Sequence, residues 1–152
     1  GDYSATIALC GMGGEMLAVL LWKINDVRLK GEPITQQDER GIFHATFERL
    51  GQERRLNILK TFRHVTEEQY KNFNLIRTSR NGYLHSWTDY PKNEQVDALN
   101  AFKKSFQLFK EITGISLADA GTVTLNPLLM KLFENKETEK TDPSQPKLDP
   151  SV

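Results

Sequence analysis

The chain has 152 residues, of which 26% are charged, and its 20 basic and 20 acidic side chains give a formal net charge of zero. This length is typical of one domain, which can bury a core without disulfides or metals. Zero net charge argues against a protein that binds nucleic acid or acidic molecules through its overall charge. Residues 49–80 nevertheless hold eight basic and three acidic residues. A polyanion would be attracted to this basic block, although solvated helix faces explain such runs as well.

Cys10 is the single cysteine, which excludes an intramolecular disulfide and is typical of a reducing compartment. It lies in an apolar stretch, where a buried and inert thiol is the usual interpretation. No run approaches the roughly 20 apolar residues that cross a bilayer, and the first residues lack the basic start of a secretory signal. We therefore expect a cytoplasmic protein that does not bind membranes.

The first predicted helix runs from Tyr3 to Ile24, where apolar residues recur at intervals of three and four. Glycines stand at positions 11, 13 and 14, and each costs a helix about 1 kcal/mol relative to alanine. The stretch CGMGGE lacks the spacing of a dinucleotide fingerprint and the Gly-Lys-Ser/Thr of a phosphate loop, and no strand precedes it. We therefore expect these glycines to admit the close approach of another helix.

Four further helices are predicted from capping signals and apolar spacing. Thr35, with Asp38 three residues later, marks the second, which we expect to continue until Gly51. Leu56 lies in a short third helix, and Thr66 with Gln69 forms a capping box for the fourth. The fifth is long and amphipathic, and its expected start and end are Asn93 and Gly114.

The pattern becomes ambiguous after Gly114. Residues 121–125 suggest a strand, and a last helix is expected from Pro127, a residue suited to the first helical turn. Residues 135–152 are polar and rich in proline, so we expect them to be disordered unless a partner or neighbouring subunit captures them. The sequence therefore predicts an all-α bundle of about five to six helices over residues 1–115, an extension over 116–134 and a disordered tail over 135–152.

The stretch LIRTSRNGYLHSW, residues 75–87, places Arg80, Asn81 and His85 within six residues near the end of the fourth helix. Residues five apart lie about 140° apart around an ideal helix, but Gly82 allows the backbone to depart from that geometry. The ordinary explanation is structural, because arginine and histidine favour helix C-termini and Asn-Gly is a turn signal. The residues alone leave both a structural and a functional interpretation open.

Other catalytic and metal patterns find little support. His44, His64 and His85 are far apart, and none has a second ligand at the spacing of a zinc motif. His64 ends a helix, where a positive charge is favourable. Ser79 and Ser86 flank the central motif, but the chain contains no GxSxG elbow. We expect no metal and no cofactor.

The stretch RNGYLH resembles the R-x4-H motif of the HEPN superfamily (higher eukaryotes and prokaryotes nucleotide-binding domains), including its polar residue directly after the arginine. The first helix, YSATIALCGMGGEMLAVLL, is similar to the first core helix of that family, which often carries a glutamate where Glu15 stands. The motif also comes late in a helix that precedes a long amphipathic one. The resemblance covers roughly residues 2–115.

This resemblance implies a helical bundle that forms a homodimer and brings two R-x4-H motifs into one cleft. Many HEPN proteins are metal-independent ribonucleases, often toxins or effectors in defence against phage. The implied partners are RNA, a second copy of the chain, and an antitoxin or nucleotidyltransferase encoded separately. Carried onto this chain, the implied catalytic residues are Arg80, Asn81 and His85.

These residue types suit RNA cleavage, because RNA carries its own nucleophile in the 2′-hydroxyl. His85 would act as the base or acid, Arg80 would stabilise the charged phosphate, and Asn81 would bind a phosphate oxygen or orient the histidine. Basic side chains before the motif would hold the RNA backbone, and aromatic rings beside it would stack on bases, although packing is the commoner role for such rings. The RNA-binding residues expected on this basis are Lys71, Arg77, Tyr83 and Trp87.

Two alternatives remain at this stage. In the first, the chain is a non-catalytic HEPN-like module that binds RNA or protein and dimerises. It also fits a plain helical dimerisation protein in which Arg80 and His85 only cap a helix.

Overall fold

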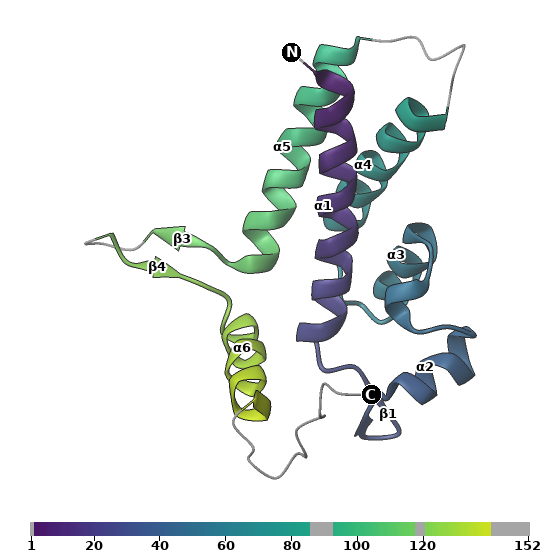
Figure 1. Cartoon of the computed structure of the whole chain (residues 1–152), viewed down its shortest axis with the longest axis vertical. Coiled ribbons are helices and arrows are strands. Elements are labelled where there is room, and N and C mark those ends of the chain that lie inside the picture. The colour runs from purple at the N-terminus through teal and green to yellow at the C-terminus, as the bar shows by residue number, and fades with distance from the viewer. Residues whose placement is uncertain (1, 86–92, 118–120, 141–152) are drawn as a thin grey trace, which may run out of the picture.

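The computed structural model describes residues 2–85, 93–117 and 121–140, with side chains except those of residues 85 and 135–140. This part of the chain is all-α, as the sequence predicts, with six α-helices and two minimal antiparallel hairpins (Figure 1). The helices are α1 (Tyr3–Ile24), α2 (Gln36–Phe43), the 3₁₀ helix η1 (Phe47–Arg49), α3 (Gln52–Thr61), α4 (Glu67–His85), α5 (Glu94–Thr113) and α6 (Pro127–Lys140). The strands are β1 (Arg28–Leu29), β2 (Glu32–Pro33), β3 (Ser116–Leu117) and β4 (Val123–Thr124).

Local capping bonds begin three of the helices where the sequence places them. The Thr35 hydroxyl accepts a bond from the Asp38 amide at 3.2 Å, and the Asp38 carboxylate accepts one from the Thr35 amide at 2.9 Å. The Thr35 hydroxyl also donates to the Asp38 carboxylate at 2.6 Å, and this bond, with the one from the Thr35 amide, holds the pKa of Asp38 below its ordinary value. Thr66 and Gln69 form the equivalent pair at 3.1 and 3.0 Å, and the Asn93 side chain caps α5. Each cap satisfies amides that a helix start leaves unpaired.

The second helix ends earlier than predicted. It was expected to continue until Gly51, but His44 adopts a left-handed conformation, with φ of 61°, and ends α2. The chain then turns so that the Phe47 amide and the Trp22 indole both donate to the buried Glu39 carboxylate, at 2.9 and 2.6 Å. The Phe47 and Trp22 rings stack at 4.3 Å. This buried contact outweighs the local preference for helix.

The fourth helix continues further than predicted. The turn expected at Asn81 and Gly82 does not form, and α4 runs through both residues to His85. Its last turn is fixed to α5 by a hydrogen bond of 2.7 Å from the Tyr83 hydroxyl to the Asp97 carboxylate. Positions 80 and 85 therefore belong to one uninterrupted helix.

Helix α1 lies in the middle of the molecule and packs against α3, α4 and α5 (Figure 1). Its buried residues recur at the three- and four-residue spacing seen in the sequence and face these neighbours, whereas Leu9, Met12 and Met16 are exposed. Burying one such side chain contributes about 1.5–3 kcal/mol. The most deeply buried side chains of the core include Ile7, Leu56, Leu59, Phe73, Ile76 and Leu108.

The glycines of α1 differ in their surroundings. A Cβ on Gly14 would lie 3.7 Å from Ile76 and 3.9 Å from Phe73, so α4 approaches closely there. At Gly11 a side chain of α4 crosses α1, whereas nothing lies within 4 Å of a Cβ built on Gly13. The prediction of close approach is confirmed for Gly11 and Gly14 and is wrong for Gly13.

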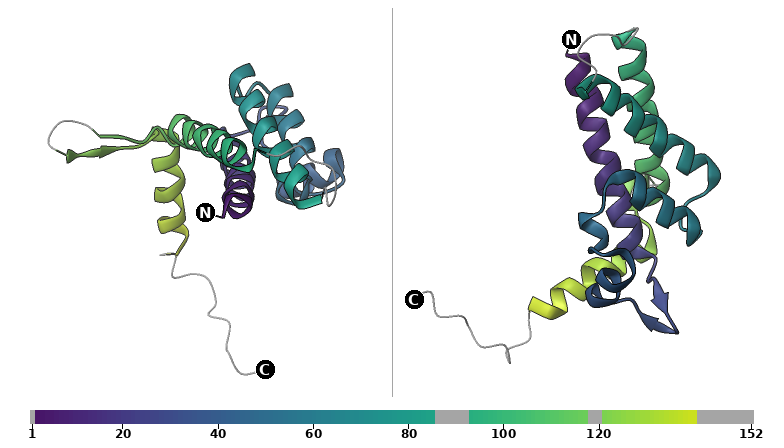
Figure 2. Two further views of the ribbon diagram at one scale, coloured as in Figure 1. Left: turned by 90° about the horizontal axis from the view of Figure 1, so that it is seen from above. Right: turned by 90° about the vertical axis from the view of Figure 1, so that its right-hand side faces the viewer.

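The chain beyond α5 forms an arm made of the β3–β4 hairpin and α6. Gly114 ends α5 with φ of 61°, and Pro127 begins α6 as predicted. Asn126 fixes the base of the arm, because its amide donates to the Thr113 carbonyl at 2.7 Å. The β3–β4 hairpin projects away from the bundle, as Figure 1 and the left view of Figure 2 show. Leu129 is buried and attaches α6 to the core.

The C-terminal boundary also differs from the prediction. Helix α6 continues to Lys140, beyond residue 135, at which a disordered tail was expected to begin. The rest of that expected tail, residues 141–152, lies outside the described residues.

Among the described residues, α1 is long and apolar enough to cross a membrane by length and composition, with a mean hydropathy of 1.6 over 18 residues. The expectation that no run approaches this length is therefore wrong. The core helix of a soluble protein can have the same length and composition. In this fold Ile7 and Ala18 of α1 are fully buried.

Candidate functional site

A polar cleft of about 570 Å³ opens between α1, α3 and α4. Three arginines and two glutamates line it together with small and amide side chains. Its volume lies in the range that accommodates a small organic ligand, roughly 300–1,000 Å³. The lining residues are Glu15, Gly51, Gln52, Glu53, Arg54, Asn57, Arg77, Arg80 and Asn81.

Arg80 reaches this cleft from α4 by crossing α1 at Gly11. A Cβ on Gly11 would overlap the Arg80 side chain, so the glycine leaves the space through which the arginine passes. The guanidinium forms an ion pair with Glu15, one turn further along α1. Its Nε is buried and has no hydrogen-bond partner among the described residues, while the side chain as a whole is 30% exposed. Arg80 is therefore held at the cleft with part of its guanidinium accessible.

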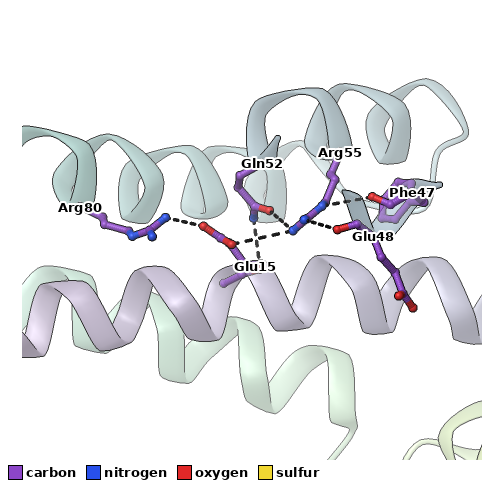
Figure 3. A network of polar contacts seen from close by, with 7 residues as sticks. Glu15, Phe47, Glu48, Gln52, Arg55 and Arg80 are labelled. Atoms are coloured by element: carbon purple, nitrogen blue, oxygen red, sulfur yellow. Dashed lines mark hydrogen bonds and ion pairs between the residues drawn. The ribbon is translucent and has the colours of Figure 1, made fainter. Parts of the chain in front are cut away.

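Glu15 lies between two arginines (Figure 3). One carboxylate oxygen pairs with Arg80, and the other lies 4.0 Å from Nη1 of Arg55. Gln52 ties α3 to α1 by donating to the Gly14 carbonyl at 3.2 Å. Arg55 is itself anchored at 3.2, 2.6 and 3.4 Å by the carbonyls of Phe47 and Glu48 and the side chain of Gln52.

Arg77 and the start of α3 form the other wall of the cleft. Arg77 pairs with Glu53 at 3.0 Å, and it also donates to Asn74 at 3.3 Å. Gly51 caps α3 without a side-chain hydrogen bond, and it lines the cleft together with the first three residues of the helix. The unpaired amides at the start of a helix carry a partial positive charge. Arg54, in the same first turn, is exposed. This wall presents donors and positive charge, which favours an anion.

The structure brings together part of the predicted site. Arg80, Asn81 and Arg77 line the cleft. Lys71 is exposed on α4 but does not line it. Tyr83, expected to stack on a base, instead packs against the core and bonds to α5.

The two remaining predicted residues are His85 and Trp87. Only the backbone of His85 is described, as the last residue of α4, and Trp87 lies outside the described residues. Because α4 is continuous, positions 80 and 85 lie about 140° apart around its axis. The helix therefore does not place both positions on one face of a single chain.

His64 differs from its expected role. Burial lowers the pKa of this imidazole, which disfavours the positive form expected at a helix end. Its ring stacks on Phe62 at 6.1 Å and meets Trp22 edge-on at 6.5 Å. His64 is part of an aromatic cluster away from the cleft.

Sequence reasoning did not single out several residues of the cleft. Arg54, which lines the cleft, and Arg55, which lies beside Glu15, were included in the basic block of residues 49–80 but were not assigned a role. The signal that pointed toward them was the local excess of positive charge. Their part in the site, like that of Gln52 and Asn57, depends on how α3 packs against α1 and α4.

Comparisons with known proteins find no match for this chain among protein-family models, curated proteins or solved structures. The resemblance to HEPN domains therefore rests on the motif and on the order and spacing of the helices in the sequence.

Proposed function

We propose that this chain is a metal-independent endoribonuclease of the HEPN type, acting as a cytoplasmic homodimer in a toxin or defence role. The observation that carries the proposal is that Arg80 and Asn81 of the R-x4-H motif line one polar cleft with Arg77 and Arg54. An antitoxin or nucleotidyltransferase encoded separately would be its regulatory partner.

The cleft has the donors that an RNA phosphate requires. An arginine fork can bind two phosphate oxygens at once and keeps its charge at every physiological pH. Arg80 has five N–H donors, and Glu15 accepts from Nη1, so donors remain for a ligand. The Glu15 carboxylate also fixes the guanidinium in position, which lowers the entropy lost when a phosphate binds. The start of α3 adds amides oriented toward negative charge.

The reaction would use the 2′-hydroxyl of RNA as the nucleophile. His85 would take its proton, the phosphodiester bond to the 5′-oxygen would break, and a second histidine would protonate that leaving oxygen. Arg80 would stabilise the charge gathered on the phosphate oxygens. The products would be a 2′,3′-cyclic phosphate and a 5′-hydroxyl.

A single chain does not supply this arrangement. Positions 80 and 85 lie about 140° apart around α4, and each chain has one His85. A two-fold dimer would provide two copies of His85, one for each proton transfer, and would let His85 of one copy face Arg80 of the other. The helix geometry thus supports a site that two copies share.

A second candidate is a non-catalytic module that binds RNA or protein. The ion pair between Arg80 and Glu15 favours it, because this contact ties α4 to α1 and gives the arginine a structural role. Both residues are about one-third exposed, and pairs of this kind contribute about 0–1 kcal/mol. The two candidates differ in whether His85 is required for a reaction.

Incubation of purified protein with mixed-sequence RNA in the presence of EDTA tests the proposal. We expect cleavage that leaves cyclic phosphate ends, and we expect His85→Asn to reduce the rate by about 100-fold or more. His44→Asn is the matched control, because His44 is an exposed histidine whose φ of 61° asparagine tolerates. Equal loss in both variants, or no cleavage by the wild type, would favour the binding module.

A further inference from the structure

A large apolar groove lies between α1, α5 and α6. It has a volume of about 1,070 Å³ and is lined mainly by these helices, together with Glu48 of η1 and Arg55 of α3. Large side chains along it are 43–72% exposed, an unusual state for residues that gain from burial. The most prominent are Leu9 and Met16 of α1, Phe102, Phe106 and Phe109 of α5, and Phe133 of α6.

We propose that this groove is the surface on which a second copy of the chain docks, groove against groove around a two-fold axis. The six side chains expose on the order of 700 Å² of apolar surface, if each measures about 200 Å² in full. A stable protein interface buries about 800 Å² on each partner. The exposed apolar area is therefore close to what a stable dimer requires.

The charges of the groove fit a copy of itself. Its charged lining consists of two basic residues, Lys23 and Arg55, and two acidic residues, Glu15 and Glu48. An interface around a two-fold axis must be self-complementary, which a balanced set of charges satisfies. The whole chain also has zero net charge, so two copies do not repel each other overall.

The C-terminal segment of the same chain is a poor occupant. Residues 141–152 read TDPSQPKLDPSV and contain only Leu148 and Val152 as large apolar residues. Such a segment offers little apolar surface to repay the entropy of ordering it. A second groove offers aromatic and aliphatic side chains of matching character.

The apolar groove is continuous with the polar cleft. Glu15 lines both, so the groove and the cleft meet at this residue, and Arg55, which lies 4.0 Å from the Glu15 carboxylate, lines the groove. A copy docked in the groove would bring its own cleft to the same seam. The inference rests on the proposed function for its catalytic meaning, since it identifies the surface that would assemble the shared site.

Sedimentation equilibrium of the full chain tests the inference without RNA. We expect twice the chain mass for the wild type, and Phe106→Glu and Met16→Glu should each raise the dissociation constant by at least about 100-fold, because each substitution enters the interface twice. Ile42→Glu is the matched control, since Ile42 is 47% exposed on α2 and does not line the groove. Helical circular dichroism would verify that all variants fold.

Several results would overturn the inference: a wild type that stays monomeric up to about 100 μM, a Phe106→Glu variant that dimerises like the wild type, or a monomer that binds phosphatidylcholine–phosphatidylglycerol vesicles through this groove. RNA cleavage, measured separately, distinguishes a failure of this inference from a failure of the proposed function. A wild-type dimer that both groove substitutions dissociate, but that cleaves no RNA, supports this inference and contradicts the proposed function. RNA cleavage by a wild-type dimer that neither groove substitution weakens does the reverse.

Discussion

The two sides of helix α1 differ in the kind of contacts that they make. On the side of α3 and α4, Glu15 engages two arginines, and Gln52 binds the backbone of α1 (Figure 3). On the side of α5 and α6, the exposed surface is apolar and includes Met16 and Phe106. The first side is completed by contacts within the chain, whereas the second leaves apolar area exposed to water.

This difference indicates which forces act on each side. Charged groups in a partly buried cleft must be paired, because an unpaired buried charge is strongly unfavourable. Apolar groups can remain exposed in a folded chain, and their burial then becomes a driving force for association. Substitutions on the two sides should therefore be distinguishable by whether they change folding or assembly.

The largest effect is expected from a pair of phenylalanines that differ in burial. Phe73 is 1% exposed against α1, whereas Phe106 is 58% exposed in the groove. Phe73→Ala should lower the free energy of unfolding by about 3–5 kcal/mol, because it leaves a cavity in the core. Phe106→Ala should change the stability of the monomer by less than about 0.5 kcal/mol.

Urea unfolding at several protein concentrations would measure both variants. A dimer makes apparent stability depend on concentration, so the Phe106→Ala effect should vanish at high dilution while the Phe73→Ala effect stays. An equally large loss for Phe106→Ala at every concentration would show that the groove is part of the folded core of one chain.

Local structure was largely predictable from the sequence, since it depends on bonds between near neighbours. The caps at Thr35, Thr66 and Asn93 form between residues three apart. Local signals failed where a distant contact prevailed. Helix α2 ends at His44 because Phe47 makes a hydrogen bond to Glu39 and stacks on Trp22. No short-range sequence pattern predicts that contact.

The candidate site shows the same division. Arg80, Asn81 and Arg77 are close in sequence and could be proposed together from the motif and the basic block. The pairing of Arg80 with Glu15 joins residues 65 positions apart, and the cleft wall formed by Gln52 and α3 depends on tertiary packing. The sequence suggested the chemistry of the site, and the packing of three helices determined its shape.

A smaller effect is expected from two glycines of α1 that face opposite sides. Gly11→Ala places a methyl group where the Arg80 side chain crosses, so it should displace the arginine and lower the free energy of unfolding by about 1–3 kcal/mol. Gly13→Ala meets nothing within 4 Å, and alanine should stabilise the helix by about 0.5–1 kcal/mol. Thermal unfolding by circular dichroism would measure both changes.

The same two variants should also differ in RNA binding by the cleft. Gly11→Ala should weaken RNA binding, measured by fluorescence anisotropy, because Arg80 no longer lies at its place beside Glu15. Gly13→Ala should leave RNA binding unchanged. If Gly11→Ala were as stable as the wild type and bound RNA equally well, the crossing of Arg80 over α1 would have no functional importance.

The smallest effect concerns His64, which lies in the aromatic cluster near the C-terminal end of α1, away from both the cleft and the groove. Burial lowers the pKa of His64 below its unfolded value of 6.5, so the unfolded chain binds the proton more readily than the folded chain. Stability from this group is therefore fully present above about pH 6.5 and decreases as the pH falls from there toward the folded pKa. Urea unfolding of the wild type and of His64→Phe between pH 5 and pH 8 would measure this pH dependence. Below about pH 6.5 we expect the free energy of unfolding to change less steeply with pH in the variant. An identical slope in both proteins would show that His64 titrates equally in the folded and unfolded states, and that the aromatic cluster leaves its imidazole open to water.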